Sequence, residues 1–233
     1  MNNIYFVFKK ELKSLFASPL AYIVIGVFLG LNSFLIVGNL QEASMRDAFG
    51  FMATLFIFVM PLLTMRTFAD ELRTGTDELL MTSPLTLAQI VVGKYLAVVA
   101  LLAAIMAMSG EYVAVIAKYG QPDWGPIFTG YLGLLLMTGS FAALGVFVSS
   151  LSKNQMAVAV ITFGAVLFVI AIQQLSSIFS GAGAAKVLEA LSLISHYTDF
   201  EKGVVDSTHI IYYGAFIFLF LFFTVRRLDA RRW

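Results

Sequence analysis

Six long apolar stretches constrain this chain more than any other feature of its sequence. A helix needs about 20 mostly apolar residues to cross the hydrocarbon core of a bilayer. The chain is 60% hydrophobic and 12% charged, which leaves too few charged side chains to cover the surface of a soluble domain of 233 residues. We therefore expect an all-α membrane protein of one domain with six transmembrane helices, at residues 20–40, 48–64, 91–117, 127–149, 156–179 and 210–225.

The positions of Lys and Arg predict how these spans are oriented. With the N-terminus inside, eleven of the fifteen basic residues fall on the cytoplasmic side and four on the other. The eleven are Lys9, Lys10, Lys13, Arg66, Arg73, Lys94, Lys153, Arg226, Arg227, Arg231 and Arg232, and the four are Arg46, Lys118, Lys186 and Lys202. Because cytoplasmic segments carry an excess of Lys and Arg, this split predicts a multi-pass protein with both termini in the cytoplasm.

Residues 3–17 precede the first span and have the pattern of an amphipathic helix. An apolar stripe lies on one side of this helix, and three lysines lie mostly away from the stripe. The pattern predicts a helix lying in the inner membrane interface, although a simple positive flank for the first span is an alternative. Ser18-Pro19 then breaks the helix and permits a sharp turn. The stripe consists of Ile4, Phe8, Leu12 and Leu15.

A polar insert separates the second and third spans at residues 69–84. Thr76 followed by Asp77 and Glu78 is typical of a helix start, because a Thr oxygen caps free amides and acids favour the positive end of the helix dipole. The apolar residues 79–81 follow, and Pro84 stops any helix. A short ordered helix with an apolar face must bury that face. Either a groove in a partner or the membrane surface could cover it.

The residues of this insert resemble the signature of type-2 ATP-binding-cassette (ABC) exporter permeases. The pattern Glu-x-x-x-Gly-Thr-x-Glu-Leu-Leu-x-x-x-Pro runs from residue 71 to residue 84, and Ile-Val-Val-Gly-Lys follows at 90–94. The resemblance covers essentially the whole chain. It includes the amphipathic N-terminal helix, the six spans and the two cytoplasmic termini. Within the family, Lys-Lys-Glu-Leu-x-x-x-Phe-x-Ser-Pro-x-Ala-Tyr at 9–22 and Arg-Thr-Phe-Ala-Asp-Glu-Leu at 66–72 are similar to gliding-motility-type permeases.

The resemblance implies roles for several segments. Residues 3–17 would be the connecting or elbow helix, residues 71–82 the coupling helix that docks into a cytoplasmic ATPase subunit, and residues 151–155 a smaller cytoplasmic contact. A second copy of the chain, or a paralogue, would pair with it in the bacterial inner membrane. An accessory protein on the outer face is a further possible partner. The ATPase-coupling residues would be Glu71, Gly75, Thr76, Asp77, Glu78, Leu79, Leu80 and Pro84.

The chain lacks the phosphate-binding motif Gly-x-x-x-x-Gly-Lys-Ser/Thr, and Gly93-Lys94 has neither the upstream glycine nor the following hydroxyl. We therefore expect ATP and Mg²⁺ to bind the partner ATPase, and no catalytic, cofactor or metal site in this chain. A net charge of +1 gives no reason to expect nucleic-acid binding.

Two functions fit these observations. The first is the permease subunit of an ATP-driven exporter, whose substrate would be lipid-like or hydrophobic because the spans offer few charges to a hydrophilic molecule. The alternative is a mechanical transmitter or scaffold, which would pass ATPase-driven motion to an outer-face protein without transporting a substrate.

Three other residues carry open alternatives. Glu111 is the one carboxylate well inside an apolar stretch, but it lies 17 residues after Lys94, or about 25 Å along a helix. It is therefore either a carboxylate near the outer water or a sensor of substrate or conformation. His196 and His209 belong to the outer loop 180–209, where we expect one or two short helices. Their separation of thirteen residues has no short metal-ligand spacing, which favours ordinary loop polarity.

Overall fold

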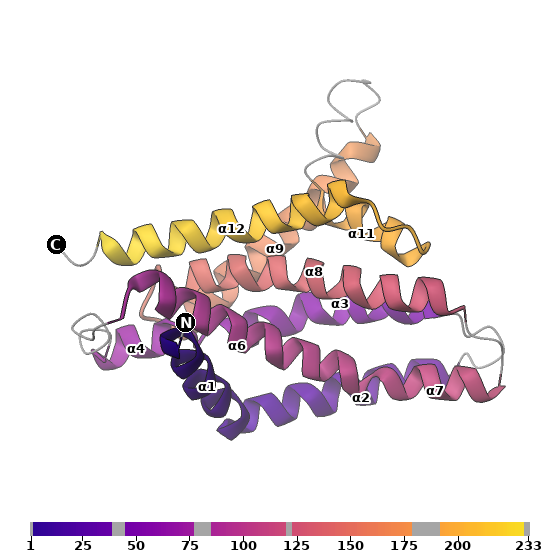
Figure 1. The fold of residues 1–233 in the computed structure, drawn as a ribbon, viewed down its shortest axis with the longest axis horizontal. Coiled ribbons are helices and arrows are strands. Elements are labelled where there is room, and N and C mark those ends of the chain that lie inside the picture. The colour runs from indigo at the N-terminus through magenta and orange to yellow at the C-terminus, as the bar shows by residue number, and fades with distance from the viewer. Residues whose placement is uncertain (1, 39–44, 77–84, 120–122, 179–191, 231–233) are drawn as a thin grey trace.

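The computed structural model describes residues 2–38, 45–76, 85–119, 123–178 and 192–230. Over these ranges the chain forms ten α-helices and no strand. Figure 1 shows most of the long helices running along one axis, with α9 crossing them at an angle. The prediction of an all-α fold is confirmed.

The long helices correspond to the six expected spans. They are α2 (Pro19–Gly38), α3 (Met45–Thr64), α6 (Leu87–Met108), α8 (Trp124–Ser149), α9 (Gln155–Ile178) and α12 (Ser207–Asp229). By length and composition, five helical segments among the described residues could cross a membrane, and α1 (Asn2–Ala17) with α2, taken as one bent span, would be a sixth. The third expected span bends at Ser109, after which α7 (Gly110–Tyr119) begins.

Helix α8 lies at the centre of the bundle and contacts α3, α6, α9, α11 (Leu193–Glu201) and α12. Three glycines let neighbouring side chains approach its backbone. A Cβ on Gly130 would lie 2.5 Å from the Phe49 ring, and one on Gly145 would lie 2.3 Å from Thr64 Oγ1. Gly133 meets Phe200 of α11 in the same way. The hydrophobic core is therefore built around α8.

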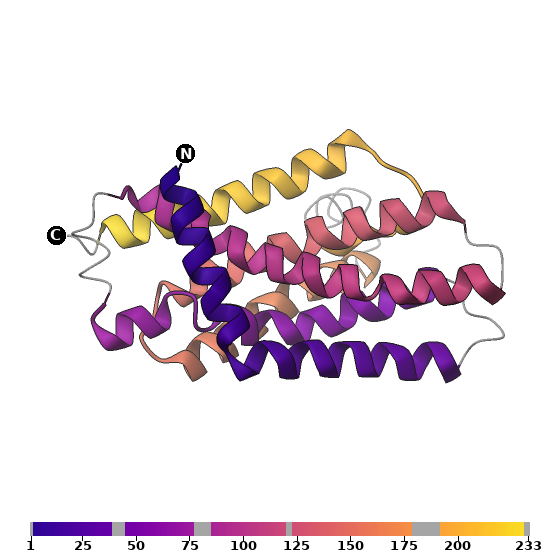
Figure 2. The same cartoon turned by 60° about the horizontal axis from the view of Figure 1, so that its bottom comes forward.

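Helices α1 and α2 form a corner at the N-terminal side of the bundle. Their axes differ by 70°, and the break lies at Ser18-Pro19 as the sequence predicts. The Ser18 hydroxyl accepts a hydrogen bond from Leu20 N at 3.3 Å, and Pro19 suits the first position of a helix because that position needs no amide donor. Figure 2 shows α1 lying across the start of α6. The two helices touch at Gly93, where a Cβ would lie 2.8 Å from Val7 Cβ.

The start of the first helix and the end of the last helix lie at the same end of the bundle. Leu228, near the end of α12, packs in one apolar cluster with Leu72 and Ile90. Because α1 crosses the start of α6 close by, the chain begins and ends its helical part on one side, as an even number of spans requires. The assignment of this end of the bundle to the cytoplasmic side of the membrane stays a prediction.

Candidate functional site

Helix α4 (Ala69–Thr74) follows the second span and begins in contact with α8. Phe68, the residue before the helix, makes no capping bond with its own side chain. Instead, the Ser149 hydroxyl at the last residue of α8 accepts hydrogen bonds from Phe68 N at 2.9 Å and Ala69 N at 3.2 Å. These amides would otherwise lack a partner at a helix start. The start of α4 is thus fixed to the end of α8.

Helix α4 ends at Gly75, which has a left-handed φ of +72°. The amides of Gly75 and Thr76 both donate to the Glu71 carbonyl, as in a glycine-terminated helix. Of the expected coupling helix over residues 71–82, residues 71–74 belong to α4, which Gly75 ends, and residues 77–82 lie outside the described residues, so the coupling helix stays a prediction. The predicted coupling residues Asp77, Glu78, Leu79, Leu80 and Pro84 lie outside the described residues, while Gly75 and Thr76 are exposed.

A buried lysine joins α4 to two other helices. Lys94 of α6 is almost closed off from solvent, with its side chain 2% exposed. Its Nζ lies 2.9 Å from a Glu71 oxygen and 3.3 Å from a Glu11 oxygen, and it donates to the Thr67 carbonyl at 2.7 Å. The three N–H donors of the ammonium thus have three acceptors, which a buried lysine needs. The Phe68 ring lies beneath it, with its centre 5.0 Å from Nζ.

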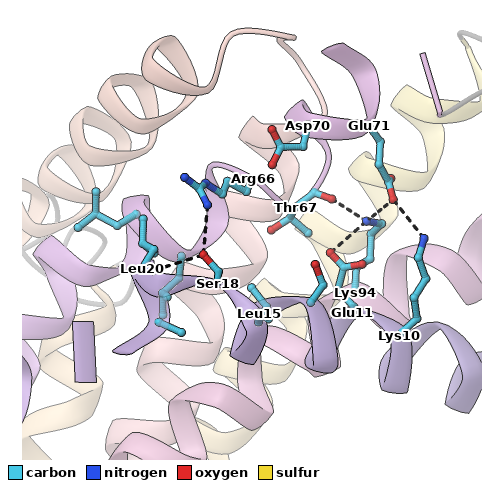
Figure 3. A pocket seen from close by; sticks show the side chains of 14 residues that line it. Lys10, Glu11, Leu15, Ser18, Leu20, Arg66, Thr67, Asp70, Glu71 and Lys94 are labelled. Atoms are coloured by element: carbon cyan, nitrogen blue, oxygen red, sulfur yellow. Dashed lines mark hydrogen bonds and ion pairs between the residues drawn. The ribbon is translucent and has the colours of Figure 1, made fainter. Parts of the chain in front are cut away.

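The charges around Lys94 form a cluster that spans the three helices α1, α4 and α6 (Figure 3). We name Glu11, Glu71 and Lys94 the Lys94 triad. Two carboxylates share one ammonium, so the triad carries one excess negative charge when both are ionised. Lys10 Nζ lies 3.9 Å from the Glu71 carboxylate and balances that charge from the surface. The result is a partly buried polar centre between α1, α4 and α6.

Helix α4 also contacts the segment that the resemblance assigns to a second cytoplasmic contact. The Gln155 amide, at the start of α9, donates to the Asp70 carboxylate, and Arg73 lies 3.9 Å from the same carboxylate. The predicted contact 151–155 therefore lies beside α4, which includes the first four residues of the predicted coupling segment 71–82.

The structure adds two residues to those that the sequence indicates at this end. Glu71, predicted as an ATPase-coupling residue, has its carboxylate pointing into the bundle toward Lys94, and its coupling role stays a prediction. Glu11 and Lys94 were not expected to belong to the site at all. A usable signal existed, because both are charged residues at the edges of apolar helix faces, and Lys94 follows a glycine where α1 can approach.

The remaining predicted residues lie away from this cluster. Glu111 is exposed in the first turn of α7, at the end of the bundle opposite α4 (Figure 1). His196 of α11 and His209 of α12 meet, with their Nδ1 atoms 2.7 Å apart, although thirteen residues separate them. His209 Nε2 lies 3.1 Å from an Asp199 oxygen. The Lys202 ammonium, and then His209, hold the pKa of Asp199 below its usual value.

Within the described ranges, no group of three His, Asp or Glu side chains is arranged to hold a metal ion. The contact between the two histidines links α11 to α12 beside Asp199. The sequence alone did not predict that these two histidines would be in contact.

The apolar helices, the angled first helix and the polar cluster at one end define a multi-pass membrane protein. Residues 6–222 match the family of ABC-2 family transporter proteins, so the chain belongs to that family. No curated protein matches the chain. Membership makes this chain a permease subunit of an ABC transporter, and it implies a cytoplasmic ABC ATPase as partner.

Proposed function

We propose that this chain is the permease of an ATP-driven exporter, and that residues 71–84 carry motion from the ATPase into the membrane. The observation that carries this proposal is the Lys94 triad, which joins α4 to α1 and α6 through a buried ammonium. A segment that docks on a moving partner transmits that motion only if it is tied to the spans. The triad is such a tie.

Three contacts connect α4 to separate helices. Lys94 binds the Glu71 side chain from α6, Ser149 caps the first turn from α8, and Gln155 bonds Asp70 from α9. A displacement of α4 would therefore act on three spans together, and on α1 through Glu11. In this proposal the ATPase moves α4, and the bundle tilts in response.

We further propose that the substrate is lipid-like or hydrophobic. Apart from Lys94 and Ser149 at the α4 end, and Thr162, whose buried hydroxyl has no described hydrogen-bond partner, the described polar side chains buried in the spans are hydroxyls and an amide that donate to carbonyls of their own helix. Thr64 donates to Met60, Thr138 to Leu134 and Thr224 to Phe220. Groups satisfied in this way offer little to a hydrophilic solute passing between the helices.

The same proposal places both termini in the cytoplasm of a bacterium, and a second copy of the chain beside the first. The described basic residues gather at the end that holds α4, which favours that end as the cytoplasmic one. We assign the chain to the gliding-motility type from its opening residues 9–22 and the run 66–72. The members of the basic end are Lys9, Lys10, Lys13, Arg66, Arg73, Lys94, Lys153, Arg226 and Arg227.

Docking is tested by placing a cation in the segment that would enter the ATPase. Leu79→Arg and Glu78→Arg should abolish copurification of the ATPase with the full-length chain, without loss of the folded membrane part. Val204→Arg is the matched control, since Val204 is exposed on the connection after α11 at the other end. Unchanged ATPase binding and ATP hydrolysis in both docking variants would sink the coupling assignment.

Transport is tested separately in vesicles that contain the permease with its copurified ATPase. ATP-dependent movement of fluorescent phospholipid analogues between leaflets is the expected result. Active ATP hydrolysis without any lipid movement would favour mechanical transmission to an outer-face protein instead.

A further inference from the structure

A pocket of about 190 Å³ lies beside the Lys94 triad, at the corner between α1 and α2. The end of α3 and the start of α4 form its other walls, as Figure 3 shows. Its volume is below the roughly 300–1,000 Å³ of ordinary small-molecule sites. It suits a small polar group better than a whole drug-sized ligand.

The pocket has one apolar side and one polar side. Leu15, Leu20 and Leu62 line it together with charged residues from α1, α4, α6 and the turn after α3. Leu62 is 41% exposed on the outer surface of the bundle. Because α1 turns through 70° into α2 here, the corner lies where the apolar part of the protein meets its polar end. A ligand with a polar head and apolar tails matches both sides.

One part of the pocket fits a phosphate. Arg66 is exposed at the end of the second span, and its guanidinium donates to the Ser18 hydroxyl at 3.2 Å. A guanidinium has five N–H donors in a planar fork, so it can hold a phosphate oxygen pair and keep this bond. Arg66 and Ser18 lie on the side of the pocket away from Lys94 (Figure 3).

Another part of the pocket fits an ammonium group. Glu11 and Glu71 share the single ammonium of Lys94, and Asp70 adds a third carboxylate to the lining. Each carboxylate oxygen can accept more than one hydrogen bond. The side next to the triad therefore offers carboxylate oxygens as acceptors to a group with several N–H donors, with Lys10 and Arg73 each 3.9 Å from one of these carboxylates.

From these two parts we propose that the pocket binds the headgroup of a phospholipid with a primary ammonium, of the phosphatidylethanolamine type. The phosphate contacts Arg66 and Ser18, the ammonium contacts the carboxylates of Asp70 and Glu71, and the acyl chains run along Leu20 and Leu62. The site belongs to the α1–α2 corner and does not depend on whether lipid is the transported substrate.

Native mass spectrometry of the full-length chain, delipidated in detergent, tests the proposal with defined lipids. We expect one phosphatidylethanolamine to bind more tightly than phosphatidylcholine, whose methylated ammonium cannot donate, or phosphatidylglycerol, which has none. Arg66→Gln should weaken phosphatidylethanolamine binding about tenfold, as expected for a lost charge-assisted contact. Arg66→Lys should retain part of the binding.

Arg226→Gln is the matched control, because Arg226 is an exposed arginine at the same end of the bundle but outside the pocket. Equal binding of the three lipids would overturn the proposal. So would an Arg66→Gln chain that binds normally, or an Arg226→Gln chain that loses as much. Soluble phosphoethanolamine should bind far more weakly than the lipid, and equal affinity for it would overturn the assignment to a lipid.

Discussion

Lys94 Nζ and Glu71 Oε1 lie 2.9 Å apart, across the gap between the third span and the short helix that follows the second. The lysine side chain is 2% exposed and the glutamate side chain 15%. A buried ion pair is stabilising only when its remaining hydrogen-bonding groups are satisfied, and its value appears mainly when one partner is removed. Because Glu11 and Thr67 complete the shell of Lys94, this pair meets that condition.

Lys94→Met should destabilise the protein by about 3–5 kcal/mol, because Glu11 and Glu71 would lose their buried cation and Glu71 would keep only the exposed Lys10, 3.9 Å away. Chemical unfolding in detergent micelles measures the loss. Lys10→Met should change the free energy of unfolding by less than about 1 kcal/mol, since that side chain is 68% exposed. Adding Glu11→Gln and Glu71→Gln to Lys94→Met should restore part of the stability, and a further loss in that triple variant would contradict the argument.

Ser149→Ala should loosen the start of α4, because the amides of Phe68 and Ala69 would lose their acceptor. The expected cost is about 1–2 kcal/mol, as for other lost helix caps. Hydrogen exchange of the peptide that covers α4 measures it. Ser150→Ala is the control, since the Ser150 hydroxyl bonds only to Phe147 of its own helix among its described hydrogen bonds. Equal exchange of α4 in the two variants would refute the capping role.

Gly93→Ala should push α1 away from α6, because the new Cβ would lie 2.8 Å from Val7 Cβ and Cγ1. Overpacking of this kind costs about 1–3 kcal/mol. Adding Val7→Ala should recover only part of the loss, because it removes Cγ1 but leaves the Cβ of residue 7 at 2.8 Å and the Ile4 carbonyl oxygen at 3.2 Å. Gly164→Ala is the control, because nothing lies within 4 Å of the Cβ it would add. Thermal unfolding of the wild-type protein and these three variants measures the effect, and a Gly93→Ala protein as stable as the control would be the contrary outcome.

The start of α12 should respond to acid through Asp206. Its carboxylate accepts the Thr208 amide at 2.8 Å, and this bond holds the pKa of Asp206 below its ordinary 3.8. The ionised cap therefore stabilises the helix start above that ordinary value, and the effect is lost as pH falls through the lowered pKa.

The measurement is hydrogen exchange of the first turn of α12 in the wild-type protein and in Asp206→Asn, compared at the same pH. Wild type should be better protected at about pH 6, and the difference should vanish at about pH 2. A difference that is absent at both pH values would show that the charge of Asp206 has no role in capping.

Local patterns were enough to predict most of the helices, because a run of about 20 apolar residues can satisfy its backbone in a membrane only as a helix. The break at Ser18-Pro19 was predicted for the same local reason. The end of α4 could have been predicted from Gly75, yet the acids after Thr76 suggested a later helix start. Whether a second helix follows Gly75 concerns residues outside the described ranges.

The Lys94 triad could not be predicted, because its members are separated by 60 and 23 residues and meet only through the packing of three helices. A lysine at the edge of an apolar stretch is usually a solvated interface residue. Lys94 is buried because α1 passes over Gly93. Helix α1 can come this close only because residue 93 is a glycine and has no Cβ. The contact between His196 and His209 was missed for the same reason, since it depends on how α11 returns to α12.

The central position of α8 limits which amino-acid substitutions the chain can accept. Its glycines at 130, 133 and 145 each meet a side chain from another helix, namely Phe49 and Thr64 of α3 and Phe200 of α11. Lipid-facing helices can exchange one apolar residue for another, because acyl chains adapt to any shape. Helix α8 cannot exchange residues in this way, because a larger residue at any of these glycines would require a smaller one at the side chain that it contacts. Accepted substitutions in this helix should therefore come in pairs.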